Sequence, residues 1–120
     1  MTSKTETGHA GGFILSEANG NRSRDAVTIK EGEDLKAGAV LGKITATGLY
    51  VAYDDGGTDD GRRTAVAILY ADCDATDGDT VATAIVRDAE VNGEELVFAS
   101  GVDEDGAVTD MASAGIIVRS

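Results

Sequence analysis

The chain has 120 residues, enough for one domain with one hydrophobic core and too few for two ordinary domains. Its 22 acidic and 10 basic residues give a net charge of −12, which argues against nucleic-acid binding and against adsorption to anionic lipid, because both need a basic patch. Cys73 is the single cysteine, so neither an intramolecular disulfide nor a cysteine-rich zinc site can form.

The N-terminal residues predict an arm that precedes the folded part of the chain. Residues 1–12 are polar, end in a Gly pair and lack apolar periodicity, so we expect a flexible segment. Phe13–Leu15 is the first apolar cluster. The alternation of apolar and polar side chains over Asp25–Ile29 then predicts the first strand.

A hairpin is predicted next. Leu35–Gly38 has the composition of a turn, and Ala39–Ile44 that of a strand. The Thr47-Gly48 pair is a tight-turn signal, so Leu49–Tyr53 should pair back on the preceding strand. Residues 54–63, dense in Asp and Gly, predict a loop.

The middle of the chain predicts two more strands. Thr64–Tyr70 is a continuous apolar run, as expected for a strand buried on both faces. A second acidic turn follows at Asp72–Asp79. Thr80–Arg87 should form the next strand.

Helical signals are confined to the C-terminal third. Asn92–Leu96 could start a helical turn with Asn92 as N-cap, and a short strand at Val97-Phe98 is the competing interpretation. Gly106–Ala114 predicts a short helix that Gly115 ends, followed by a terminal strand. The sequence thus predicts a mainly β fold with one or two short helices, in one domain over residues 13–120.

No catalytic constellation is visible. His9, the only histidine, falls in the predicted arm, and Cys73 lies between two carboxylates that suppress its thiolate. The strongest chemical candidates are acidic loop residues, which could offer oxygen ligands to calcium but are also ordinary turn formers. These weak metal candidates are Asp54, Asp55, Asp59, Asp60, Asp72 and Asp74.

The absence of a signal-peptide apolar region and of a long apolar run indicates a soluble, unexported protein. From the residues alone, a soluble acidic ligand-binding module, with or without calcium, remains an alternative function. The distribution of charge is uneven, because residues 1–43 carry six groups of each sign while residues 44–120 carry the whole −12.

Several segments, in order along nearly the whole chain, resemble the tailed-phage head decoration proteins, the family of the bacteriophage lambda decoration protein D. The matching segments are Phe13–Gly20, Ser23–Ile29, Leu35–Ile44, Ala67–Tyr70, Ile85–Asn92 and Gly115–Arg119. The resemblance implies a compact β-clip-like domain, a homotrimer, no enzymatic activity and no cofactor. It also implies a place on the outer surface of the virion after synthesis in the host cytoplasm, with the phage major capsid protein as partner.

The same resemblance assigns capsid binding to the arm, over residues 1–12 and the adjoining apolar residues. The expected capsid-binding residues are Thr2, Ser3, Lys4, Thr5, Glu6, Thr7, Gly8, Phe13 and Ile14. The arm should order on the capsid by adding a strand to the major capsid protein and so stabilise the expanded shell against genome pressure. The charge distribution predicts that the acidic loops face away from the end where the arm leaves the domain.

Overall fold

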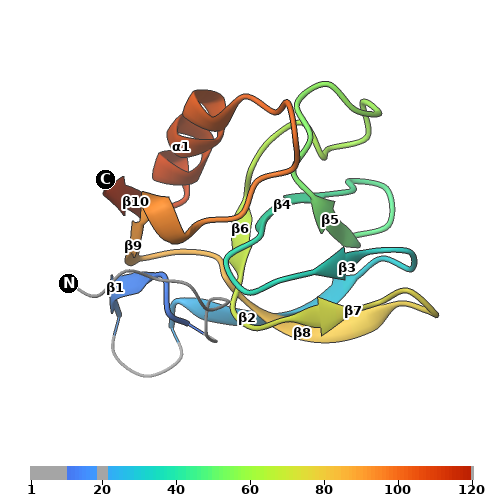
Figure 1. Cartoon of the computed structure of the whole chain (residues 1–120), viewed down its shortest axis with the longest axis horizontal. Helices are drawn as coiled ribbons and strands as arrows, with labels where there is room; N and C mark the ends of the chain where they lie inside the picture. The colour runs from blue at the N-terminus through green and yellow to red at the C-terminus, as the bar shows by residue number, and fades with distance from the viewer. Residues whose placement is uncertain (1–10, 19–21, 120) are drawn as a thin grey trace.

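The computed structural model describes residues 11–18 and 22–119, which contain ten strands, one α-helix and one 3-10 helix (Figure 1). The strands are β1 (Ile14–Glu17), β2 (Arg24–Ile29), β3 (Asp34–Leu35), β4 (Val40–Lys43), β5 (Tyr50–Ala52), β6 (Ala67–Leu69), β7 (Cys73–Asp74), β8 (Thr80–Ile85), β9 (Ala89–Asn92) and β10 (Ile116–Arg119). The helical elements are η1 (Gly93–Glu95) and α1 (Glu104–Ser113). The mainly β prediction is confirmed.

Five strands close a barrel in the order β2-β5-β4-β6-β8. The predicted hairpin is confirmed, since β4 and β5 pair antiparallel from Leu41 opposite Ala52 to Lys43 opposite Tyr50. A long antiparallel ladder joins β2 to β8, and a parallel contact between Ile29 and Tyr50 completes the ring. Strands that lie far apart in the sequence therefore become neighbours, and the barrel has no free edge in this ring.

The barrel interior is filled by aliphatic side chains. All three residues of β6 are buried, which confirms the predicted buried strand, although it is shorter than the apolar run Thr64–Tyr70. The fully buried barrel residues include Ile29, Leu41, Ala67, Leu69 and Ala84. Burial of each large aliphatic side chain stabilises the fold by about 1.5–3 kcal/mol relative to exposure.

A second buried cluster lies where α1 covers the three-stranded sheet β1-β9-β10. Helix α1 contributes Ala107 and Met111, both with 0% of their surface exposed. Strand β9 lies at the centre of this sheet, antiparallel to β1 and parallel to β10. One strand therefore holds both the first and the last described strands, which lie together at the left of Figure 1.

The predicted C-terminal helix is confirmed, but it begins two residues earlier than Gly106. The Asp103 side chain accepts a 3.0 Å hydrogen bond from the amide of Gly106, so Asp103 is the N-cap and Glu104 the first helical residue. At the other end Gly115 has φ +86°, the left-handed conformation that ends the helix as expected.

The helical turn after β9 is confirmed as η1. The amide of Glu94 donates a 3.0 Å hydrogen bond to the Asn92 side chain, so Asn92 caps the turn. The competing strand at Val97-Phe98 is reduced to an isolated parallel bridge between Ala39 and Val97.

Two segments predicted as turns contain a short ladder. Strand β3 takes up Leu35, and β7 takes up Cys73 inside the acidic segment Asp72–Asp79. They pair antiparallel over two residues each, Asp34 with Asp74 and Leu35 with Cys73. A ladder this short leaves no alternating pattern in the sequence, because it depends on contacts across the chain.

Candidate functional site

The predicted arm meets the domain at Gly11. Its amide donates a 2.8 Å hydrogen bond to the carbonyl of Tyr70, and the carbonyl of Phe13 accepts one of 2.8 Å from the amide of Asn92. The Phe13 side chain is only 2% exposed and belongs to the core under α1. Phe13 therefore anchors the root of the arm in the domain.

Of the predicted capsid-binding residues, only Phe13 and Ile14 fall within the described residues. Ile14 is half-buried and packs against the same core as Phe13. His9 and the remaining predicted arm residues, Thr2, Ser3, Lys4, Thr5, Glu6, Thr7 and Gly8, lie outside the described residues.

Strand β1, which follows the arm, is an edge strand. Among the described residues it pairs with β9 alone, through a register that shifts between Ile14 and Ser16. Leu15 at this irregularity is 56% exposed, so the edge presents an apolar side chain beside unpaired backbone groups. The sequence revealed the apolar cluster here but not a strand, because β1 exists only by pairing with β9.

A charged clamp fixes the far end of β1. The Arg24 guanidinium donates hydrogen bonds of 3.1 and 2.6 Å to the two carboxylate oxygens of Glu17. The pairing with Glu17 raises the pKa of Arg24, and the same guanidinium lies 4.3 Å from the ring centre of Tyr70. A bidentate pair that also covers an aromatic face fixes a defined orientation.

In the acidic loop between β5 and β6, most carboxylates accept hydrogen bonds from other groups of the protein. Asp54 accepts from the amide of Gly56 at 3.1 Å, and Asp55 accepts from the amide of Asp103 at 2.9 Å. Asp60 forms a bidentate pair with Arg62 at 3.0 and 2.8 Å, which lowers the pKa of Asp60. Asp59 is exposed in this loop.

The second acidic segment uses its carboxylates in the same way. Asp72 accepts a 2.8 Å hydrogen bond from the amide of Ala37, on a segment more than thirty residues earlier. Asp74 accepts from the amide and the hydroxyl of Thr76 at 3.0 and 2.5 Å, and these hydrogen bonds lower the pKa of Asp74. Both carboxylates therefore accept hydrogen bonds that hold turns and loops of the protein in place.

No three or more His, Cys, Asp or Glu side chains within residues 11–18 and 22–119 are grouped to hold a metal ion. Cys73 is buried between strands, where burial first and then the charges of Asp74 and Asp34 raise the pKa of its thiol. Cys73 packs in the barrel core, as predicted, and its lack of reactivity stays a prediction. Across the part of the chain that the structure describes, no helix is both long and apolar enough to cross a membrane.

The two acidic segments are not part of the three-stranded sheet that contains β1. In Figure 1 the loop between β5 and β6 lies at the top and the turn between β7 and β8 at the far right, whereas β1, β9 and β10 lie at the left. The loop between β5 and β6 reaches the start of α1, where Asp55 accepts a hydrogen bond from the amide of Asp103. That the acidic loops face away from the end where the arm leaves the domain stays a prediction, because the root of the arm at Gly11 is bonded to Tyr70, two residues before Asp72.

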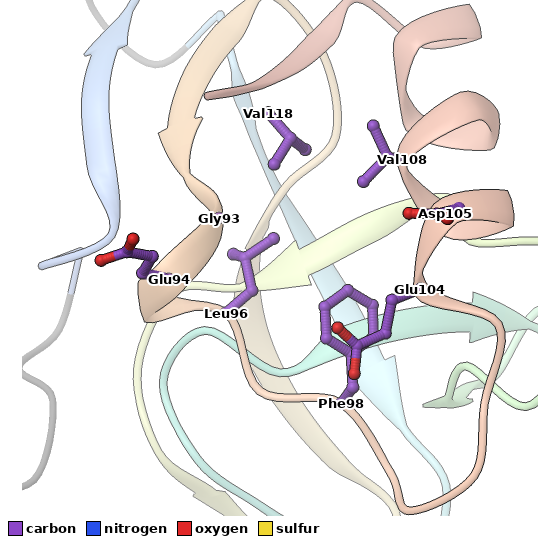
Figure 2. A pocket seen from close by; sticks show the side chains of 8 residues that line it. All are labelled: Gly93, Glu94, Leu96, Phe98, Glu104, Asp105, Val108 and Val118. Atoms are coloured by element: carbon purple, nitrogen blue, oxygen red, sulfur yellow. The ribbon is translucent and has the colours of Figure 1, made fainter. Parts of the chain in front are cut away.

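A pocket of about 230 Å³ opens beside the three-stranded sheet, between α1, β10 and the segment after β9 (Figure 2). Its floor is apolar and consists of Leu96, Phe98, Val108 and Val118. Its rim carries Glu94, Glu104 and Asp105. Sequence reasoning missed this pocket, because its floor comes from three elements that no motif connects.

The described residues thus show buried aliphatic cores, an exposed strand edge and an apolar pocket. Most carboxylates of the acidic loops accept hydrogen bonds from the protein's own backbone and side chains. The strand edge and the pocket are surfaces that a partner can contact. The family model of the bacteriophage lambda head decoration protein D matches residues 3–116. The chain belongs to this family of phage head decoration proteins, as the sequence resemblance indicated.

Membership establishes the general role. The family decorates the phage head, so the protein is a structural component of the virion that binds the capsid, and the family is not one of enzymes. No curated protein matches the chain in sequence.

Proposed function

We propose that three copies of the chain form a trimer on the outside of the expanded capsid, at three-fold and quasi-three-fold positions. In this proposal the N-terminal arm of each copy adds a strand to the major capsid protein and staples the joints of the shell against the pressure of the packaged genome. The protein binds no nucleic acid, since its −12 charge opposes contact with phosphate.

The observation that carries the proposal is the anchored root of the arm. Phe13 is buried in the core and Gly11 is bonded to Tyr70, so the arm leaves the domain from a fixed point beside the edge strand β1. A segment held at its root explores a small volume, which raises its effective concentration near a neighbouring sheet edge.

The reach and energetics of the arm fit this role. Ten extended residues span at most about 33–36 Å, enough to cross to an adjacent subunit. Fixing their backbones costs roughly 10–20 kcal/mol, so docking needs a complete row of hydrogen bonds from a partner strand. Three arms on one trimer bind with avidity, and each docked arm stabilises the assembled shell by mass action.

Removing residues 2–10 tests the arm, because this deletion leaves Gly11 and its hydrogen bond to Tyr70 in place. The shortened protein should keep its melting temperature and oligomeric state and lose occupancy on expanded capsids in a cosedimentation assay. Unchanged occupancy would contradict the arm model.

A second pair of variants tests strand addition itself. Proline at Thr5 and Thr7 removes two backbone donors, whereas alanine at the same two positions keeps them. T5P/T7P should lose occupancy and T5A/T7A should retain it. Equal occupancy of the two variants would show that the arm does not bind as a strand.

The trimer has its own test. Sedimentation equilibrium should give a molar mass three times that of the 12.2 kDa chain. A monomer at all accessible concentrations would contradict trimer formation in solution.

A further inference from the structure

The pocket beside α1 is a part of the core that is open to solvent. Leu96, Phe98 and Val118 pack against the buried cluster under α1, yet each keeps part of its surface exposed. The volume of about 230 Å³ is below the roughly 300–1,000 Å³ of small-molecule pockets, and it suits one inserted side chain. Figure 2 shows the apolar side chains converging on this space.

The charge around the pocket specifies what can enter it. Glu94, Glu104 and Asp105 are exposed at the rim, and no basic residue lines the pocket. Glu104 and Asp105 also stabilise the first turn of α1 through the helix dipole, which explains their presence in the helix but does not neutralise them toward solvent. An apolar group accompanied by positive charge complements this surface.

The position of the pocket selects the partner. Strand β9 pairs with β1 and continues directly into Gly93 at the pocket, so the pocket and the root of the arm share one strand. A partner that receives the arm is therefore also the partner that this pocket meets.

We propose that the pocket receives an apolar side chain flanked by Lys or Arg from the major capsid protein, as a second contact beside the arm. This inference rests on the proposed function, because it takes the shell as the partner. The apolar side chain contacts Phe98 and Val108, while the flanking cations face Glu104 and Asp105. The pocket thereby fixes the orientation of the domain on the shell, which an arm alone leaves free.

Neutralising the rim tests the electrostatic half of the proposal. In E104Q/D105N the shape is kept and two charges are removed, and D59N/D77N makes the same charge change at two exposed carboxylates in the acidic segments. With expanded capsids as the probe, E104Q/D105N should bind about three- to tenfold more weakly than D59N/D77N. Raising the salt concentration should also weaken the wild type more than E104Q/D105N.

An isosteric pair tests the apolar half. V108T places a hydroxyl on the pocket floor, and V81T makes the same change at a side chain on β8 that is 69% exposed. V108T should reduce capsid occupancy and V81T should leave it unchanged. Melting temperatures of all four variants show that each is folded.

The outcomes separate the two proposals. Equal binding by the pocket variants and their controls overturns the pocket contact and leaves the capsid role intact. Failure of the wild type to bind expanded capsids overturns the proposed function as well. Loss of the trimer in E104Q/D105N or V108T, measured by sedimentation, assigns the pocket to a second copy of the chain and overturns the shell contact.

Discussion

The hydroxyl of Tyr53 donates a 2.9 Å hydrogen bond to the backbone carbonyl of Asp103, the N-cap residue of α1. The Tyr53 side chain is 2% exposed, so the bond lies at the boundary between the core and the acidic loop. Burial, followed by the charges of Asp55 and Asp103, raises the pKa of Tyr53 to about 12. One side chain thus links the end of the barrel hairpin to the start of the helix that borders the pocket.

Replacing Tyr53 with Phe should reduce the free energy of unfolding by about 0.5–1.5 kcal/mol at pH 7, the usual contribution of one hydrogen bond. The raised pKa of Tyr53 adds an alkaline signature, because the folded state keeps its proton from the ordinary value of 10.0 up to about 12. The stabilisation that comes from the protonated Tyr53 hydroxyl is fully present below pH 10 and is lost as the pH rises toward 12. Urea unfolding at pH 7 and above pH 10 should show a smaller alkaline loss in Y53F; equal losses would contradict this role.

Replacing Asp103 with Ala should destabilise the protein by about 0.5–2 kcal/mol, because the amide of Gly106 loses its cap. D103N is the matched control, since an asparagine side chain offers an equivalent oxygen. Thermal unfolding followed by circular dichroism should rank wild type and D103N above D103A. A ranking with D103A and D103N equal would show that the cap does not stabilise α1.

Glycine is required at position 38 for two reasons that a control can separate. Gly38 has φ +90°, and a Cβ there would lie 2.7 Å from the carbonyl oxygen of Glu95. Gly32 has φ +98° with nothing within 4 Å of its Cβ position. We expect G32A to cost about 1–2 kcal/mol for the backbone conformation alone, and G38A to cost about 1–3 kcal/mol more for the collision. Chemical denaturation measures both, and equal losses would rule out the close contact.

The salt bridge between Asp60 and Arg62 should contribute to the loss of the protein's stability in acid. Its pairing with Arg62 lowers the pKa of Asp60 below the ordinary 3.8, so the stabilisation is present above that pH and is lost as the pH falls through the lowered value. D60N should therefore be less stable than wild type at pH 7 and should lose less stability on acidification. D59N, which removes an exposed carboxylate from the same loop, is the control for net charge. Parallel acid profiles of D60N and wild type would contradict the prediction.

Local patterns in the sequence predicted the elements whose signals are contained in a few neighbouring residues. The alternation in β2, the Thr47-Gly48 turn and the Gly115 stop of α1 all gave elements close to those observed. The helix begins two residues before the predicted Gly106 because the Asp103 side chain caps it there, although Gly106 has a weak helix propensity.

Features that depend on distant contacts could not be read in this way. Strand β1 forms because Phe13 and Ile14 meet β9, some seventy-five residues later, and the barrel closes through the pair Ile29 and Tyr50. The pocket likewise combines α1, β10 and the segment after η1, whose apolar residues look like ordinary core positions in the sequence. The role on the phage head was predicted from the family resemblance, because no single residue pattern in the chain indicates it.

The central position of β9 has a consequence for biosynthesis. A nascent chain that has emerged only as far as α1 carries β1 and β9 but lacks β10, so the sheet that supports the arm has one side of β9 unpaired. A product terminated before Ile116 would expose that strand together with the apolar residues that β10 covers. Prematurely ended copies should therefore be cleared by proteases or aggregate before they reach a capsid, which keeps defective subunits out of the virion.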